Sequence, residues 1–151
     1  QEMGLKEEVQ FVCLNYCAYE LLIQQAGDAT EGVVGSILFA PPSTGAEGVQ
    51  VALDYAEANN IDLGGNEIPF VQGWWAMAIL VEGIENTVEA GQELTGPNIK
   101  ASLEALEGFE TGGVTVPISF SPDDHRGNRQ LKLYRVENGE WVPITDFIAA
   151  E

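Results

Sequence analysis

The fold class of this chain is indicated most clearly by residues 9–42, VQFVCLNYCAYELLIQQAGDATEGVVGSILFAPP. Its apolar run Val9–Leu14 predicts a short buried strand, and Tyr19–Ala26 predicts a helix. A second apolar strand is expected over Val33–Ala40, because two prolines follow it. A strand, a helix and a strand in this order are typical of parallel strands joined by a covering helix. The stretch therefore predicts an α/β fold with a parallel sheet flanked by helices.

Three more helices are expected after this stretch. The first two cover Val49–Asn59 and Val71–Ala90. The third begins at Gly96-Pro97, because proline suits the first helical position, and ends at Gly108. The long middle helix repeats apolar side chains every three or four positions. These residues are Phe70, Trp74, Met77, Val81, Ile84 and Val88, with Trp75, Ile79 and Leu80 beside them. So broad a stripe predicts a helix that is buried on most sides.

The C-terminal part is expected to be rich in β-structure. Val114–Phe120 consists mainly of residues that favour strands. Gln130–Val136 and Glu140–Ile144 predict two further strands, joined at Asn138-Gly139. Asn-Gly suits a tight type I′ turn, in which both central residues need a positive φ. The chain is therefore expected to close with a β-hairpin.

The composition excludes several kinds of partner. The chain has 151 residues, with 24 Asp and Glu against 6 Lys and Arg, so its surface repels nucleic acids and anionic lipids. The most apolar run, Trp74–Val81, is shorter than the roughly 20 residues of a membrane-spanning helix. A metal site would need more soft ligands than Cys13, Cys17 and His125 supply, and we expect two half-buried thiols rather than a tight disulfide. No nucleic-acid partner, metal or other cofactor is expected.

The first residues suggest a longer parent protein. Gln1–Gln10 is charged and lacks the apolar core of a signal peptide. Gln1–Gly4 is typical of the last turn of a helix, with Gly4 as its C-cap. We therefore expect this chain to be the C-terminal part of a larger protein.

Motifs of common enzymes are missing from the sequence. It contains no GxxxxGK[ST] phosphate loop, no GxGxxG run and no GxSxG nucleophile elbow. A Ser-His-Asp triad would have to use His125 beside Asp123 and Asp124, but such a polar run is more typical of a turn with its own side-chain hydrogen bonds. We therefore expect no enzymatic activity.

Four motifs, in order along the chain, resemble a known family. The run Ala26–Val33, AGDATEGV, resembles the "AGDAAEGM" run of leucine/isoleucine/valine-binding proteins. Ile68-Pro-Phe-Val71, the run Ile118–Gly127 and the closing Asn138-Gly139 hairpin resemble later parts of the same family. Together they cover nearly the whole chain without large gaps. The sequence thus resembles the type I periplasmic substrate-binding proteins of branched-chain amino acid ABC transporters.

The resemblance implies two α/β lobes that close on a small ligand, of which this chain would supply an incomplete part. Residues 1–60 would form the second half of lobe two. Residues 61–113 would form a helical return that contributes to lobe one, and residues 114–151 would bring the last strands back to lobe two.

The resemblance also implies three ligand-binding residues. Asn15 falls where amino-acid-binding members carry an acidic residue for the ligand amine; an asparagine can hydrogen-bond to an ammonium but cannot neutralise it. Tyr16 is adjacent, at the carboxyl end of a parallel strand, where open α/β sheets bind ligands. Phe70 falls where the family has a pocket aromatic at the hinge.

Each of these residues has a purely structural alternative. Asn15 and Tyr16 could form an ordinary loop and helix N-cap, and Phe70 could pack in the core against Trp74. The resemblance places His125-Arg126 in a family turn, where we expect a structural role.

The function that the resemblance implies is solute binding for import. The chain would belong to the extracytoplasmic solute-binding component of an ABC importer, capturing an amino acid or similar small carboxylate by hinge closure and then docking on a membrane permease. A ligand-sensing domain of the same fold in a receptor or regulator is the alternative, and a small α/β hydrolase is a weaker one. A homodimer is also expected to be feasible, because an incomplete fold can exchange elements with a second copy.

Overall fold

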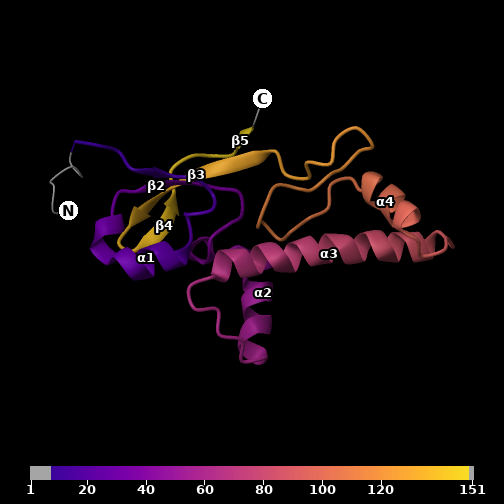
Figure 1. Ribbon diagram of the computed structural model, residues 1–151, viewed down its shortest axis with the longest axis horizontal. Coiled ribbons are helices and arrows are strands. Elements are labelled where there is room, and N and C mark those ends of the chain that lie inside the picture. Colours follow the sequence, from indigo (N-terminus) through magenta and orange to yellow (C-terminus); the bar gives the residue numbers. More distant parts are fainter. Residues whose placement is uncertain (1–7, 150–151) are drawn as a thin grey trace.

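The computed structural model describes residues 8–149, which form a mixed sheet with helices around it and a long helix that extends away from it (Figure 1). Its elements, in chain order, are β1 (Val12–Cys13), α1 (Glu20–Ala26), η2 (Gly27–Thr30), β2 (Val34–Ile37), η3 (Pro42–Thr44), α2 (Glu47–Ala58), α3 (Glu67–Glu89), α4 (Gly96–Glu104), β3 (Gln130–Glu137), β4 (Glu140–Pro143) and β5 (Ile148–Ala149). The α/β fold class predicted from the sequence is confirmed.

The sheet combines parallel and antiparallel pairs in the order β1-β2-β3-β4, with β5 also paired to β3. β1 and β2 are parallel, in the register Val12↔Val34, as the strand–helix–strand pattern predicts. β2 pairs antiparallel with β3 through Gly35↔Tyr134. Within residues 8–149, parallel pairing is therefore limited to β1 and β2, because the C-terminal hairpin inserts its first strand, β3, beside β2.

The predicted hairpin turn is present at Asn138 and Gly139. Both residues have a positive φ, 55° and 78°, as a type I′ turn requires. The Glu31 carboxylate accepts hydrogen bonds from both turn amides, at 3.0 Å from Asn138 N and 2.7 Å from Gly139 N. A side chain from the segment before β2 thus holds the turn.

The expectation of β-structure over Val114–Phe120 is wrong apart from one isolated bridge, between Phe109 and Ile118. The Thr111 hydroxyl accepts a hydrogen bond from the Thr115 amide at 2.9 Å, which closes a local turn. Pro117 has no N–H to donate to a ladder. Turn formation therefore outweighs the β propensity of this segment.

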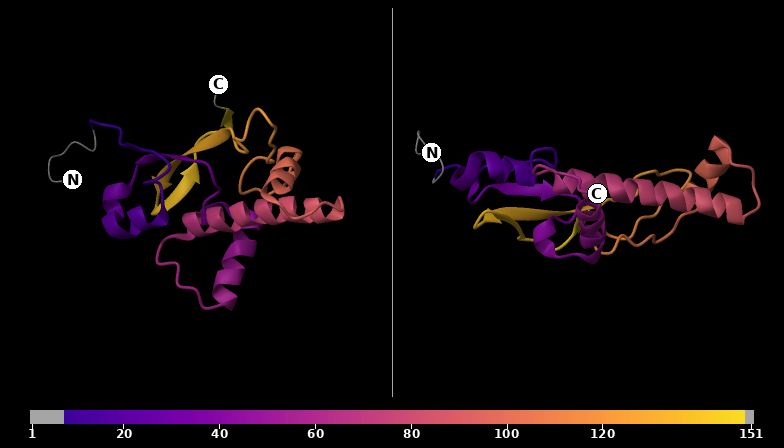
Figure 2. Two further views of the ribbon diagram at one scale, coloured as in Figure 1. Left: turned by 45° about the vertical axis from the view of Figure 1, so that its right-hand side comes forward. Right: turned by 90° about the horizontal axis from the view of Figure 1, so that it is seen from below.

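The long helix α3 lies where the apolar periodicity predicts it, but it is not buried on most sides. Met77 is 57% exposed and Val88 is 54% exposed. Its buried residues are Ile68, Val71, Gly83 and Thr87. Both views of Figure 2 show α3 extending beyond the sheet, with α4 near its far end. The stripe was identified correctly, but within residues 8–149 few elements cover it.

Two clusters of buried side chains meet at the start of α3. The first contains Ile68 and Trp141 and lies under the sheet, and the second contains Val71 and Val49 and lies beside α2. The partly buried Phe39 packs against both. The first turns of α3 therefore connect the sheet to the helical part of the molecule.

Cys13 and Cys17 are free thiols, as expected, but they are not both half-buried: Cys13 is buried and Cys17 is exposed. Among residues 8–149 no group of three or more His, Cys, Asp or Glu side chains could hold a metal ion. In the same residues, no helix has both the length and the apolar composition needed to span a bilayer.

Candidate ligand-binding site

The N-terminal turns of α1 and α3 are held side by side. The Leu21 amide donates to the carbonyl oxygen of Gly65 at 3.0 Å. The Ile68 amide donates to the Glu20 carboxylate at 3.4 Å. Because the first amides of a helix lack internal partners, these contacts satisfy one orphan donor in each helix.

Two carboxylates lie at this junction, one in the first turn of each helix. Glu20 Oε1 and Glu67 Oε2 are both buried and have no hydrogen-bond partner among the described residues. The pKa of Glu20 is raised to about 7: burial raises it most, backbone hydrogen bonds, including the one from Ile68, oppose the shift, and the nearby Glu67 carboxylate adds to it. Glu20 is thus an acid whose charge changes near neutral pH.

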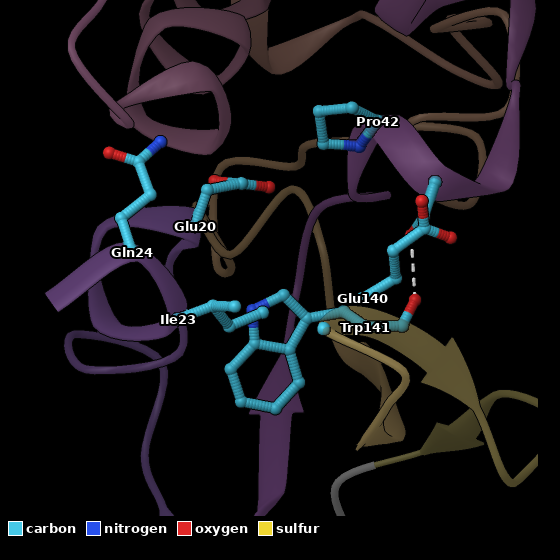
Figure 3. A pocket seen from close by; sticks show the side chains of 8 residues that line it. Glu20, Ile23, Gln24, Pro42, Glu140 and Trp141 are labelled. Carbon is cyan, nitrogen blue, oxygen red and sulfur yellow. Dashed lines mark hydrogen bonds between the residues drawn. The ribbon is translucent and has the colours of Figure 1, made fainter. Parts of the chain in front are cut away.

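A cavity of about 430 Å³ opens between α1, η3 and β4. α1 contributes Glu20, Ile23 and Gln24 to its wall, η3 contributes Ser43, and the hairpin contributes Glu140 and Trp141. In Figure 3 the Glu20 carboxylate and the nitrogen-bearing edge of the indole lie on the same side of the cavity as Ile23. Trp141 is 2% exposed, yet its Nε1 has no partner among the described residues.

Asn15 and Tyr16 lie in the turn after β1, which closes with a 3.0 Å hydrogen bond from the Cys17 amide to the Leu14 carbonyl. Asn15 is half-buried, and its Oδ1 is buried without a hydrogen-bond partner in the described part of the chain. Tyr16 is 87% exposed. Neither residue lines the cavity beside Glu20.

Phe70 is half-buried on α3 and packs against the second buried cluster. It also lines a shallow groove along α3 with Trp74 and Met77. No cavity described here contains Phe70 together with Asn15 or Tyr16. The assignment of these three residues to one ligand site remains a prediction.

Sequence reasoning missed Glu20 and Trp141. A glutamate in the first turn of a helix is ordinary, because it interacts favourably with the helix dipole, so it gave no signal. Trp141 is one apolar residue of a hairpin strand. Only the folded chain brings the two to one cavity.

The turn at residues 121–128 has the structural character expected of it. Asp124 accepts hydrogen bonds from the Arg126 guanidinium and pairs with Arg129 at 2.5 Å; the Arg126 hydrogen bonds above all lower the pKa of Asp124 far below its usual range. His125 Nε2 contacts Glu104 Oε1 at 2.7 Å. Asp124 is therefore occupied by arginines and does not orient His125 as a triad would require.

Comparison with known proteins places the chain in a family. Residues 1–140 match the sequence profile of a family described as periplasmic binding protein. This chain belongs to the periplasmic binding protein family. The resemblance seen in the sequence is thereby confirmed. No curated protein matches the sequence.

Three solved structures share the fold of this chain. A branched chain amino acid ABC transporter from Thermus thermophilus, solved with bound valine, is 21% identical, with a TM-score of 0.82 over 99% of this chain and 41% of its own length. An ABC transporter substrate binding protein from Aeropyrum pernix is 24% identical, with a TM-score of 0.74 over 99% of this chain and 40% of its own. An extracellular ligand-binding receptor from Rhodopseudomonas palustris HaA2 is 17% identical, with a TM-score of 0.60 over 95% and 42%. The chain thus spans about two fifths of the length of each of these three proteins.

Proposed function

We propose that this chain is part of an extracytoplasmic solute-binding protein of an ABC importer, which captures an amino acid or similar small carboxylate and performs no chemistry on it. Membership of the periplasmic binding protein family supports a binding role. The likeness in fold to a branched chain amino acid ABC transporter with bound valine favours this class of ligand. Capture would occur by hinge closure, and the closed form would dock on a membrane permease.

The connection between the sheet and the helical part carries this proposal. After β2 the chain leaves the sheet through Leu38, and it returns to the sheet at β3, shortly after Asn128. The Asn128 side-chain amide donates a hydrogen bond to the Leu38 carbonyl oxygen at 3.1 Å. Two segments that run between the same two parts are therefore tied together. A hinge needs a few such segments, which absorb the rotation while the packed parts stay rigid.

We also propose a division of the chain that comes from the resemblance in sequence and not from this connection. Residues 1–60 would belong to lobe two, 61–113 would form a helical return contributing to lobe one, and 114–151 would return to lobe two. The start of α3, where the two buried clusters meet, would lie at the hinge.

Asn15, Tyr16 and Phe70 are the proposed ligand contacts. The free Asn15 Oδ1 can accept a hydrogen bond from a ligand amine. The exposed Tyr16 ring and the half-buried Phe70 ring would supply apolar surface. They occupy no common cavity in the described chain, so the proposal requires closure to bring them together.

Variants of the complete polypeptide test this site. Affinity for L-amino acids and small carboxylates would be measured by thermal shift and calorimetry for wild type, Asn15→Ala and Phe70→Ala. Glu57→Gln is the control, because Glu57 is exposed on α2 and lines none of the cavities described here. Loss of about tenfold or more in both site variants and none in the control is expected, since each removes a desolvated contact. Unchanged affinity in both site variants would rule out these contacts.

A ligand-sensing receptor is the second candidate. One structural neighbour is an extracellular ligand-binding receptor. Such a protein would bind its ligand in the same way, but it would not support import when paired with a permease. Uptake of labelled ligand by cells that carry the permease therefore separates the two.

A further inference from the structure

Two of the residues that line the cavity between α1, η3 and β4 each hold a buried polar atom that has no hydrogen-bond partner in the described part of the chain. Trp141 Nε1, a donor, is buried without a partner among residues 8–149, and so is Glu20 Oε1, an acceptor. The two atoms do not bond to each other. Because a buried polar group without a partner is unfavourable, a molecule that formed hydrogen bonds with both atoms would be favoured.

The polar side chains that line the cavity determine which charge a bound molecule can carry. Two carboxylates, Glu20 and Glu140, line the cavity together with the Gln24 amide and the Ser43 hydroxyl. None of the lining residues is Lys, Arg or His. A third carboxylate, Glu67 in the first turn of α3, is close enough to Glu20 to raise its pKa. An anion would be repelled here, whereas an ammonium would be attracted.

The cavity also has an apolar side. Ile23 and the ring of Trp141 face it, and the indole is held by the packing of its cluster under the sheet. A ligand with an aliphatic body would bury that body against these two side chains. The volume of about 430 Å³ is within the range of small-molecule sites.

We propose that this cavity binds a small aliphatic amine that also carries a hydrogen-bond acceptor, with its ammonium on Glu20 and its acceptor on the Trp141 indole N–H. This site does not include Asn15, Tyr16 or Phe70, so it goes beyond the proposed transport function and does not depend on it. Its specificity is for a cation without a carboxylate, which differs from the ligand proposed for import.

Titration of the ¹⁵N-labelled 151-residue chain with leucinol, followed by NMR, tests the proposal. The chain has 3 tryptophans, and Trp141→Phe identifies the indole N–H signal of Trp141. Leucinol has an ammonium, a hydroxyl acceptor and an aliphatic body. Leucinol is expected to shift the Trp141 indole N–H signal in a saturable way. The indole N–H signal of Trp75 should not shift, because that N–H already donates a hydrogen bond to the Gly48 carbonyl oxygen at 3.0 Å.

Three ligand controls define the chemistry. 4-Methylpentanoate carries a negative charge, 4-methylpentan-1-ol lacks the amine, and 3-methylbutylamine lacks the hydroxyl. We expect no binding of the carboxylate and at least about tenfold weaker binding of the alcohol and of the simple amine, because each loses one of the two polar contacts. Equal shifts from leucinol and 4-methylpentanoate, or no saturable shift from leucinol in the folded chain, would overturn the proposal.

Two variants separate this site from the proposed import site. Glu20→Gln keeps the shape of the side chain but removes its charge, and it should weaken the binding of leucinol at least about tenfold at pH 8. Asn15→Ala and the surface control Glu57→Gln should leave leucinol binding unchanged. Loss of binding in Asn15→Ala but not in Glu20→Gln would place the amine in the import site and contradict the proposal.

The affinity should also depend on pH. Glu20 faces Glu67 of α3 and shares the cavity with Glu140 of β4, and it ionises as the pH rises through about 7. Leucinol remains an ammonium throughout this range, so its affinity should rise by about tenfold between pH 6 and pH 8. An affinity that falls or stays flat over this interval would contradict the role of Glu20.

Discussion

Ser43 and Trp141 are 98 positions apart in the sequence and are joined by a 2.6 Å hydrogen bond from Ser43 Oγ to the Trp141 carbonyl oxygen. The bond ties η3, which follows β2, to β4 at the edge of the sheet. It also fixes two walls of the cavity relative to each other, because both residues line it.

Ser43→Ala is therefore expected to destabilise the chain. The Trp141 carbonyl would lose its side-chain partner, at a cost of about 1 kcal/mol in the free energy of unfolding. Urea denaturation would measure the loss against Glu57→Ala, a change on the exposed surface of α2. A Ser43→Ala midpoint equal to that of the control would show that the bond contributes nothing.

Two helical glycines should respond to alanine in opposite ways. A Cβ at Gly48, in the first turn of α2, would collide with the carbonyl oxygen of Thr111 and meet the Trp75 and Val114 side chains at 2.9 Å. A Cβ at Gly73, within α3, would meet nothing within 4 Å. Gly48→Ala should lower the free energy of unfolding by about 2–3 kcal/mol through overpacking.

Gly73→Ala should instead raise the free energy of unfolding by about 0.5–1 kcal/mol, because alanine loses less backbone entropy in a helix than glycine. Thermal unfolding of the two variants side by side provides the measurement. A stabilising Gly48→Ala would mean that α2 does not approach the loop at residues 111–113 as described.

Glu20 makes the stability depend on pH. Its pKa is raised by burial from 4.5 to about 7 in the folded chain, so the folded state binds this proton more tightly than the unfolded state. The resulting stabilisation is fully present below about pH 4.5 and is lost as the pH rises through about 7, an effect on the order of 3 kcal/mol.

Glu20→Gln should remove this contribution. The variant should unfold at a higher urea concentration than wild type at pH 8, and its stability should fall less between pH 5 and pH 8. Because the net charge of −18 also affects this range, Glu57→Gln serves as the charge-matched control. Identical pH profiles for the two variants would show that Glu20 is not buried in its charged form.

The two cysteines should differ strongly in reactivity. Cys17 is exposed, whereas Cys13 is buried and its pKa is raised to about 12, mainly by burial and further by Cys17. Ellman's reagent at pH 8 should react quickly with one thiol in the native chain and with two after unfolding. Cys17→Ser should abolish the fast phase; a fast phase that persists would mean that Cys13 is accessible.

Local signals in the sequence predicted much of this fold. Apolar periodicity located α3, the proline at Pro97 located the start of α4, and Asn138-Gly139 located the hairpin turn. These features depend on neighbours in sequence. The prediction of β-structure for Val114–Phe120 was wrong because the Thr115 amide donates a hydrogen bond to the Thr111 hydroxyl and closes a turn. Strand propensities of single residues do not take such a hydrogen bond into account.

The cavity could not be predicted in the same way. Glu20 and Trp141 come from opposite ends of the chain, and neither residue type is unusual in its element. The exposure of Met77 and Val88 was missed for a related reason: periodicity identifies an apolar stripe but does not show what covers it. Both features depend on packing between distant segments.

The central proposal, that this chain belongs to a solute-binding protein, is tested most directly by calorimetric titration of the complete polypeptide with L-valine, L-leucine, L-isoleucine and small aromatic and aliphatic carboxylates, followed by recovery of each ligand. We predict that at least one compound binds with one-to-one stoichiometry and is recovered chemically unchanged. Conversion of the bound compound into a product, or the absence of binding across the whole panel, would contradict the proposal.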